Sequence, residues 1–277
     1  MSNKIPLQDK FKELRQNKQA LLATNFYNFE TLKGILQAAS LTNNPIILQL
    51  TKSSIDYMGL PVALDLAESM LKLYGVEGWV HLDHGDSYDL IARCLDAGIK
   101  SVMIDASEKP MDENIRLTKS VVKLAEQYGA NVEAELGYVA KLGQQRGNIG
   151  FTEPVEAKQF VEETGINALA VAIGSAHGFY TEEPNLDLDL LSRIASATPV
   201  ALVLHGASGI PHATLVKAVE RGICKINLAT EIKHIFMETL KTGMAGQNEI
   251  DLRKVFPPAT SAITDLVKDK LSVLGRG

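Results

Sequence analysis

Short apolar segments alternate with segments of helical periodicity along almost the whole chain, and this alternation constrains the fold most. Several of the apolar segments, such as 168–174 and 199–205, are nearly continuous runs without polar alternation. Such runs are typical of parallel strands that are buried on both faces. We expect strands at Ala20–Phe26, Pro45–Thr51, Trp79–His84, Ser101–Ala106, Asn131–Leu136, Ala168–Gly174, Pro199–His205 and Ile223–Leu228.

Eight strand–helix units in a chain of this length predict an α/β fold, the (β/α)8 TIM barrel, for which about 250 residues is typical. An extra helix is expected at Gln8–Gln16, and Asn248–Leu274 is expected to form a helical extension outside the barrel. The alternative is an open doubly wound sheet, which usually has a Gly-rich turn after its first strand. Asn25–Asn28 stands there instead, which favours the barrel. No low-complexity linker divides the chain, so residues 1–277 are expected to form a single domain.

Composition excludes several classes of function. The net charge is −5 and like charges form no block, so nucleic-acid binding has no electrostatic support. The longest apolar runs are far shorter than the roughly 20 residues that a membrane helix needs. The first residues have no apolar core typical of a signal peptide, and the chain has two cysteines, so we expect a cytoplasmic protein without a disulfide framework.

Three of the six histidines stand where predicted strands end. In a TIM barrel, the carboxyl ends of the strands carry the chemistry. His84, His177 and His205 come from three different strands, so their imidazoles can converge above the barrel. Three imidazoles and one open position are typical of catalytic zinc. The alternative is three hydrogen-bonded histidines that line a pocket, while His81, His212 and His234 are expected to be packed or solvated imidazoles.

Carboxylates also end predicted strands. Asp83 directly precedes His84, and a carboxylate beside a divalent cation can exchange protons with a bound substrate. The alternative role for Asp83 is a hydrogen bond to a ligand imidazole. Asp105 and Glu135 fit better as groups that orient the ligands or hold a second or alternative metal ion.

Small residues after the last strands predict a phosphate site. Gly206, Ala207 and Ser208 follow one strand, and the segment Asn227, Leu228, Ala229 and Thr230 leads from the next strand into a helix. Small side chains let backbone N–H groups approach an anion, and a helix N-terminus adds a favourable dipole. Gly178 can supply a further N–H group, although all of these residues are also compatible with ordinary turns.

A divalent ion that polarises a carbonyl, a phosphate site and a carboxylate are together the parts of a metal-dependent retro-aldol reaction. A Schiff-base mechanism would need a lysine in the site. Lys225 within a predicted strand and Lys52 are the only candidates near strand ends. That mechanism would leave the three histidines unexplained.

Five segments together resemble the class II, zinc-dependent fructose- and tagatose-bisphosphate aldolases, and the resemblance covers nearly the whole chain. They are His81–Gly85, Val132–Gly137, Gly174–Gly178, His205–Gly209 and Lys225–Thr230. The resemblance implies one catalytic Zn²⁺ per subunit, held by His84, His177 and His205. It implies that Asp83 acts as acid and base at the C4 hydroxyl of a ketose 1-phosphate or 1,6-bisphosphate, which is cleaved to dihydroxyacetone phosphate and an aldehyde.

The resemblance also implies a set of substrate-binding residues and an assembly. Dihydroxyacetone phosphate would be held by Gly178, Gly206, Ala207, Ser208, Asn227, Leu228, Ala229 and Thr230, with Asn227 near the enediolate. Asp251–Arg253 resembles a family segment whose arginine reaches the distal phosphate of a neighbouring subunit. Arg253 therefore implies a homodimer or homotetramer. A monovalent cation as a second cofactor is left open.

The chain departs from the family in one loop. Family members usually carry a glutamate in a mobile Gly-rich loop, whereas Tyr138–Gly147 contains no acidic residue and adds Lys141 and Arg146. Either another group takes the role of that glutamate, or the substrate differs, for example by an anionic aldehyde. A catalytically weak or silent barrel is one alternative. A zinc hydrolase is another, but such barrels usually carry His-x-His on the first strand, where this chain has none.

Overall fold

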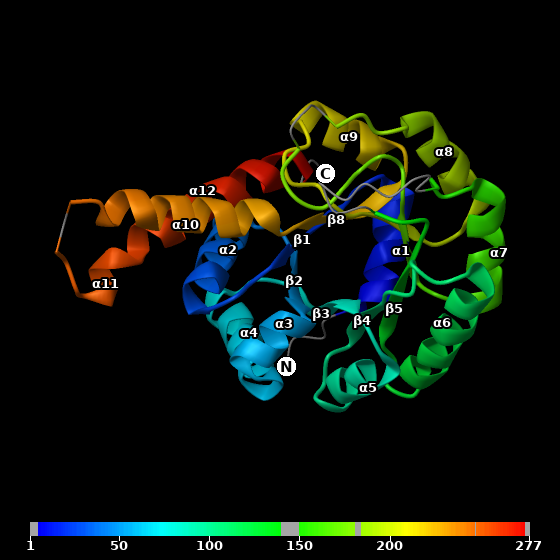
Figure 1. Ribbon diagram of the computed structural model, residues 1–277, viewed down its shortest axis with the longest axis horizontal. Helices are drawn as coiled ribbons and strands as arrows, with labels where there is room; N and C mark the ends of the chain where they lie inside the picture. The colour runs from blue at the N-terminus through cyan, green and yellow to red at the C-terminus, as the bar shows by residue number, and fades with distance from the viewer. Residues whose placement is uncertain (1–4, 140–149, 181–183, 247, 275–277) are drawn as a thin grey trace.

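The computed structural model describes residues 5–139, 150–180, 184–246 and 248–274, and the statements below concern these residues. Eight parallel strands close into a barrel in the order of the sequence (Figure 1), which confirms the predicted TIM barrel. They are β1 (Leu21–Asn25), β2 (Ile46–Thr51), β3 (Gly78–Gly85), β4 (Ser101–Ile104), β5 (Asn131–Leu136), β6 (Ala168–Val171), β7 (Ala201–Leu204) and β8 (Ile223–Leu228).

Helices surround the barrel and pack on it through apolar faces. They are α1 (Leu7–Asn17), α2 (Phe29–Thr42), α3 (Lys52–Met58), α4 (Leu60–Tyr74), α5 (Tyr88–Asp96), α6 (Met111–Glu126), α7 (Pro154–Thr164), α8 (Leu188–Ala197), α9 (His212–Glu220), α10 (Thr230–Met244), α11 (Leu252–Val255) and α12 (Pro257–Leu274). That residues 1–277 form one domain stays a prediction.

Two helical regions differ from the sequence-based expectation. The short helix α3 was not expected; the Thr51 side chain caps it by accepting a hydrogen bond from the N–H group of Ser54, and Gly59 ends it. The C-terminal extension forms two helices, not one. Pro257 and Pro258 have no N–H group to continue a helix from α11, so a new helix, α12, begins at Pro257.

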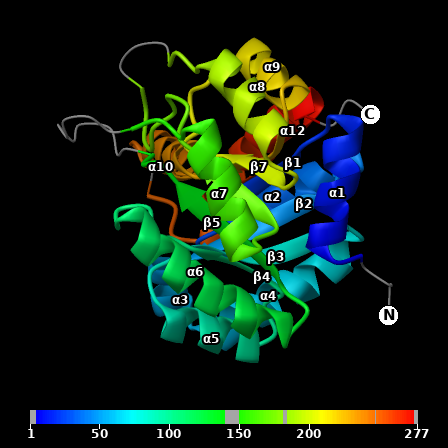
Figure 2. The same ribbon diagram turned by 90° about the vertical axis from the view of Figure 1, so that its right-hand side faces the viewer.

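The helix α1 closes the amino-terminal end of the barrel, as Figure 2 shows. Leu7, Phe11 and Leu14 lie one turn apart on one face and are each at most 4% exposed. They pack with Trp79 and with small apolar residues that point into the barrel, including Ala170. The chemistry of the barrel is therefore confined to its other end.

The helices α10, α11 and α12 extend beyond the barrel as an arm, with α11 at its far end (Figure 1). The inner part of this arm is anchored because α12 packs on α2 and α10. The outer part carries exposed apolar side chains at Met244, Ile250 and Leu252. No helix in the described ranges is long and apolar enough to cross a membrane, while the cytoplasmic location stays a prediction.

Candidate active site

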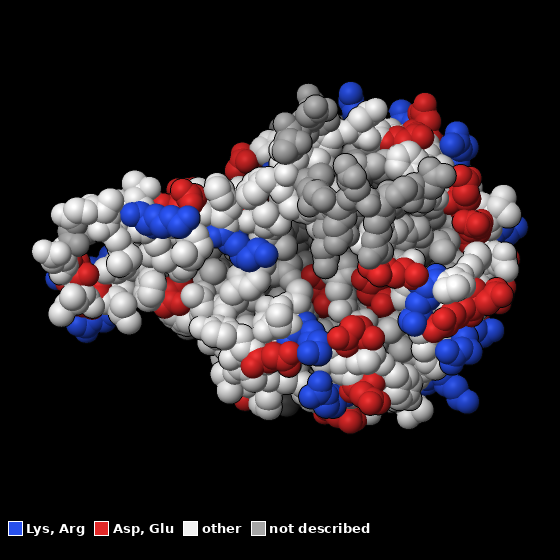
Figure 3. Space-filling model, in the orientation of Figure 1, with Lys and Arg blue, Asp and Glu red and all other residues white. Residues whose placement is uncertain are grey.

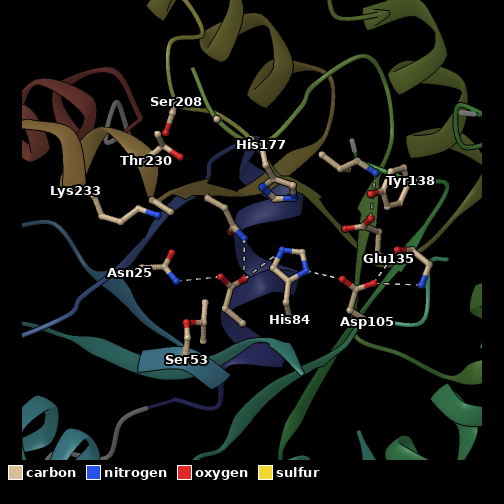
Figure 4. Close-up of a pocket in the computed structure, with 18 of the residues that line it drawn as sticks. Asn25, Ser53, His84, Asp105, Glu135, Tyr138, His177, Ser208, Thr230 and Lys233 are labelled. Carbon is tan, nitrogen blue, oxygen red and sulfur yellow. Dashed lines mark hydrogen bonds and ion pairs between the residues drawn. The ribbon is translucent and has the colours of Figure 1, made fainter. Parts of the chain in front are cut away.

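A cavity of about 570 Å³ lies at the carboxyl ends of the strands (Figure 4). Most residues that the sequence predicts for the site line it: Asp83, His84, Asp105, Glu135, His177, Gly178, Gly206, Ser208, Asn227, Ala229 and Thr230. His205 is completely buried beneath it. Besides His205, three predicted residues are not among the lining residues. Ala207 and Leu228 pack into the core between strands and helices, and Arg253 lies on α11 in the arm.

The three predicted histidines converge. Each offers a ring nitrogen, and these nitrogens lie within 4.8 Å of one another. Nε2 of His84 and Nδ1 of His205 are 3.1 Å apart. Two nitrogens that bind zinc at about 2.0–2.1 Å in a tetrahedron are themselves about 3.3 Å apart. The rings of His84 and His177 have centroids 5.2 Å apart. The residues present therefore fit a zinc ion.

Carboxylates orient two of these imidazoles. Nδ1 of His84 donates to Asp105 at 2.6 Å, and Nε2 of His205 donates to Glu133 at 3.0 Å. With a metal ion bound, each hydrogen bond would keep the one ring proton on the nitrogen that faces the carboxylate, and would leave a lone pair for the ion on the nitrogen that faces the other imidazole. Carboxylates in this position are typical of metal-bound histidines, whose orientation they fix.

A break in strand pairing brings Asp83 and His84 to the same cavity. Adjacent strand residues normally point to opposite faces. Here the register between β3 and β4 shifts between Leu82 and Gly85, and His84 has a φ of 48° in the left-handed region. The following Gly85 lies so close to β4 that a Cβ atom would be 2.5 Å from the carbonyl oxygen of Met103. Gly85 therefore allows the close approach to β4 at the register shift, where β3 directs the side chains of both Asp83 and His84 into the site.

Three side-chain amides hold the Asp83 carboxylate. Asn25 donates to Oδ2 at 3.0 Å, while Gln49 and Asn227 donate to Oδ1 at 3.2 and 3.4 Å. Burial raises the pKa of Asp83, but the neighbouring histidines, Lys225 and the hydrogen bond from Asn25 outweigh burial and lower the pKa overall. Asp83 is thus an oriented, ionised group beside the histidine cluster.

The same negative surroundings hold a proton on His84. Burial lowers the pKa of His84, but Asp83 and Asp105 outweigh burial and raise it to about 9. Burial and the positive neighbours lower the pKa of His205 well below its usual value. Without a metal ion, the cluster therefore carries a proton on His84, which a divalent cation would have to displace.

Glu135 and Asp105 form a second group with His84 that could hold a metal ion. Burial, and then the charge of Asp105, raise the pKa of Glu135 to about 8. One oxygen of Glu135 accepts from the N–H group of Val139, and the other is buried without a hydrogen-bond partner in the described part of the chain. A cation between the carboxylates of Glu135 and Asp105 would offset their repulsion and would give the unpartnered oxygen of Glu135 a partner.

The loop after β7 is tied to the start of α10. The N–H group of Glu231 donates to Ser208 Oγ, and the Glu231 carboxylate accepts from the N–H group of Gly209. Gly206 has a φ of 68°, and a Cβ atom there would overlap the backbone of Ala176, so this position requires glycine. The N–H group of Ala207 donates to the carbonyl of Asn227, so it is engaged within the protein.

A sequence model of one family, described as "Fructose-bisphosphate aldolase class-II", matches residues 5–277. The chain belongs to the class II fructose-bisphosphate aldolase family. This family membership identifies the protein as an aldehyde-lyase. The resemblance that the sequence motifs indicated is thereby confirmed.

Similar proteins agree with this family. The chain is 38% identical to the D-tagatose-1,6-bisphosphate aldolase subunit GatY of Klebsiella oxytoca over 92% of both chains. The crystal structure of the YdjI aldolase from Escherichia coli K12 has a TM-score of 0.87 at 33% identity and covers 97% of this chain and 96% of that chain. A putative fructose-1,6-biphosphate aldolase from Coccidioides immitis has a TM-score of 0.88 at 30% identity, with 99% and 96% covered.

Sequence reasoning missed several residues of this aldolase site. Gln49 lies two positions before Thr51 and Glu133 lies two positions before Glu135, each on the inward face of its strand, so the alternation of strand residues could have found them. Ser53 lies in α3, which was not expected, and Lys233 lies on a helix, where no sequence pattern marked it. The positively charged loop residues Lys141 and Arg146 lie outside the described residues.

Proposed function

We propose that this aldolase is zinc-dependent and cleaves a ketose 1-phosphate or a ketose 1,6-bisphosphate, of the fructose or tagatose type, to dihydroxyacetone phosphate and an aldehyde. The observation that carries the proposal is the convergence of three imidazoles beside an ordered carboxylate in one cavity. The identity to a D-tagatose-1,6-bisphosphate aldolase subunit supports the substrate class.

His84, His177 and His205 would hold the zinc ion. When bound, the ion would polarise the ketone of the substrate as a Lewis acid. Asp105 and Glu133 keep two of the imidazoles in the orientation that binding needs. Asp105 and Glu135, together with His84, offer a second position for a metal ion at the same site.

Asp83 would move the proton at the C4 hydroxyl. Bond cleavage requires a base that removes this proton as the aldehyde forms, and condensation requires the reverse transfer. The amides of Asn25, Gln49 and Asn227 donate to the carboxylate and favour one orientation of it. The lowered pKa of Asp83 means that it begins cleavage as the ionised base.

The phosphate of dihydroxyacetone phosphate would lie against Gly178, Gly206, Ser208, Ala229 and Thr230. These residues line one side of the cavity, and the last two open the 15-residue helix α10, whose dipole favours an anion. Ala207 and Leu228 contribute through the backbone that shapes these loops. Asn227 lines the cavity and also donates to Asp83, which supports a role for it between the phosphate side and the reacting carbons.

Arg253 would serve the site of a second subunit. It is largely exposed, pairs only with Asp251 among the described residues, and lies in the arm away from its own cavity (Figure 1). An exposed cation at the end of an extended arm with apolar neighbours suits an interface between copies. We propose a homodimer or homotetramer in which Arg253 reaches the distal phosphate of a neighbour.

The direct test compares wild type with Asp83→Asn on a panel of fructose and tagatose bisphosphates and ketose 1-phosphates. The zinc-loaded wild type is expected to release dihydroxyacetone phosphate, and the Asp83→Asn variant to keep its zinc but lose about 10²–10⁴ in turnover. Asp89→Asn, an exposed residue in the first turn of α5, is the matched control. Absence of cleavage across the panel would instead support a silent barrel.

A further inference from the structure

The hydroxyl group of Tyr180 joins the loops that follow β6 and β7. It accepts a hydrogen bond from the N–H group of Ala176 at 2.7 Å and donates one to the carbonyl oxygen of Gly206 at 2.9 Å. A phenolic hydroxyl has one proton to donate and lone pairs that accept, so it can make both contacts at once. One side chain therefore ties a backbone group of each loop to the same oxygen atom.

Both of these backbone groups stand next to candidate zinc ligands. Ala176 directly precedes His177, and Gly206 directly follows His205. The two loops also lie in direct contact, because a Cβ atom at Gly206 would be 2.4 Å from the carbonyl oxygen of Ala176. The Tyr180 hydroxyl therefore joins the loops at the point where each of them carries an imidazole.

The barrel itself does not place the three ligands equally. His84 lies within β3 and His205 directly follows β7, whereas β6 ends six residues before His177. The hydrogen bonds between strands fix residues within the sheet, so the position of His177 depends on the contacts that its loop makes. The hydrogen bond from Ala176 to Tyr180 is such a contact, and it lies directly before the ligand.

The ring of Tyr180 is anchored, which defines the position of its hydroxyl. Tyr180 is partly buried and packs against the hydrophobic core between strands and helices. The ring also lies beside Gly209 in the loop after β7, where a Cβ atom would be 3.5 Å from Cδ2 of the ring. A packed ring has already lost its conformational freedom, so its hydroxyl can hold the two loops without a further entropic cost.

We propose that Tyr180 is a positioning residue that fixes the loops of His177 and His205 relative to each other for zinc binding. This inference rests on the proposed function, and Tyr180 acts through the backbone without touching the ion or the substrate. Asp105 and Glu133 orient imidazoles through their ring nitrogens. The Tyr180 hydroxyl instead sets how far apart two ligand-bearing loops lie, and the ring centroids of their histidines are 5.8 Å apart.

The test compares zinc binding by wild type, Tyr180→Phe and Tyr128→Phe. Tyr180→Phe keeps the ring and removes only the hydroxyl, and we expect zinc affinity to fall about tenfold, as for other groups that orient metal ligands. Tyr128→Phe is the matched control, because its hydroxyl donates to Asp96 and it does not line the cavity. Each variant loses one hydroxyl, so urea unfolding without metal should differ little between them, while zinc affinity should fall in Tyr180→Phe alone.

Cobalt(II) in place of zinc gives a second readout that a merely structural hydroxyl would not change. The visible absorption of cobalt(II) depends on the arrangement of its ligands. The spectrum of Tyr180→Phe should therefore differ from that of wild type in band position or intensity, whereas the spectrum of Tyr128→Phe should match wild type.

Unchanged zinc affinity together with an unchanged cobalt spectrum in Tyr180→Phe would overturn the inference and leave the zinc site of wild type standing. Absence of zinc binding by wild type would overturn both the inference and the proposed function. If wild type binds zinc but cleaves no ketose phosphate, the proposed substrate class is wrong, and the metal-binding comparison still decides the role of Tyr180.

Discussion

At the scale of single residues, Glu133 connects the histidine cluster to a buried network inside the barrel. It accepts from His205 at 3.0 Å and forms a 2.7 Å ion pair with Lys225, which is completely buried. Lys225 also contacts His81, and His81 contacts Ser101 at 2.7 Å, so His81 is a packed imidazole as expected. Lys225 therefore has a structural partner inside the barrel. This pairing argues against the alternative in which Lys225 forms a Schiff base with the substrate.

We expect Glu133→Gln to weaken both the fold and the zinc site. It leaves the Lys225 ammonium buried without a counter-charge, which costs about 3–5 kcal/mol of the free energy of unfolding. It also weakens the acceptor that orients His205, so zinc affinity should fall about 10–100-fold. Urea unfolding and zinc titration measure the two effects.

The double variant Glu133→Gln with Lys225→Met separates these effects. It removes the buried ammonium, so it should recover part of the stability while zinc affinity stays low. Full recovery of zinc affinity in the double variant, or unchanged affinity in the single variant, would contradict the orienting role of Glu133.

Residues that end strands were predictable, because a TIM barrel presents them all on one rim. Asp83, His84, Asp105 and Glu135 were found in this way. Their exact partners were not predictable, since contacts such as Gln49 to Asp83 depend on strand stagger. Lys233 was not predictable because helical periodicity alone does not say which exposed lysine turns toward a cavity.

At the scale of elements, apolar periodicity predicted which segments form strands and which form helices. It did not predict local irregularities within or between these elements. The register shift in β3 could not be read from its sequence, because a bulge depends on the neighbouring strand. The short helix α3 has too few residues for a periodic signal. The division of the extension into α11 and α12 had a visible signal in Pro257 and Pro258, which mark a helix start.

Gly206→Ala tests whether the loop after β7 needs its glycine. A methyl group would overlap the backbone of Ala176 at a left-handed φ of 68°. We expect a loss of about 1–3 kcal/mol in the free energy of unfolding and reduced turnover, because this loop shapes the phosphate side. The measurement is urea unfolding with a cleavage assay.

Gly243→Ala is the matched control. Gly243 lies within α10, and a Cβ atom there would meet nothing within 4 Å. Alanine should leave turnover unchanged and stabilise the helix by up to about 1 kcal/mol. If both variants unfolded at the same urea concentration, the steric argument for Gly206 would be wrong.

At the scale of the whole molecule, the arm separates Arg253 from the cavity of its own chain. Arg253 is 90% exposed as a side chain, and α11 forms the far end of the arm. Figure 3 shows charged side chains of both signs spread over this face of the molecule, and the acidic ones include those at the mouth of the barrel. The proposed interface does not follow from any sequence pattern, because the sequence implied an oligomer only through the family resemblance.

Mixing two inactive variants tests whether sites are shared between subunits. Asp83→Asn and Arg253→Ala chains should each cleave a ketose bisphosphate poorly. A mixed dimer contains one site with an intact Asp83 and a neighbour's intact Arg253, so random reassembly should restore about a quarter of wild-type turnover. Turnover that equals the sum of the separate variants would contradict a shared site. Each variant mixed with wild type serves as the control for subunit exchange.

Zinc dependence tests the central claim most directly, because every assigned role depends on an ion at the three imidazoles. The purified protein should contain one zinc ion per chain, lose release of dihydroxyacetone phosphate when a chelator removes that ion, and recover it when zinc is returned. The His205→Asn variant should bind no zinc at the same concentration, whereas His234→Asn, on the exposed face of α10, should bind it normally. Cleavage at an undiminished rate by protein stripped of its metal would contradict the account.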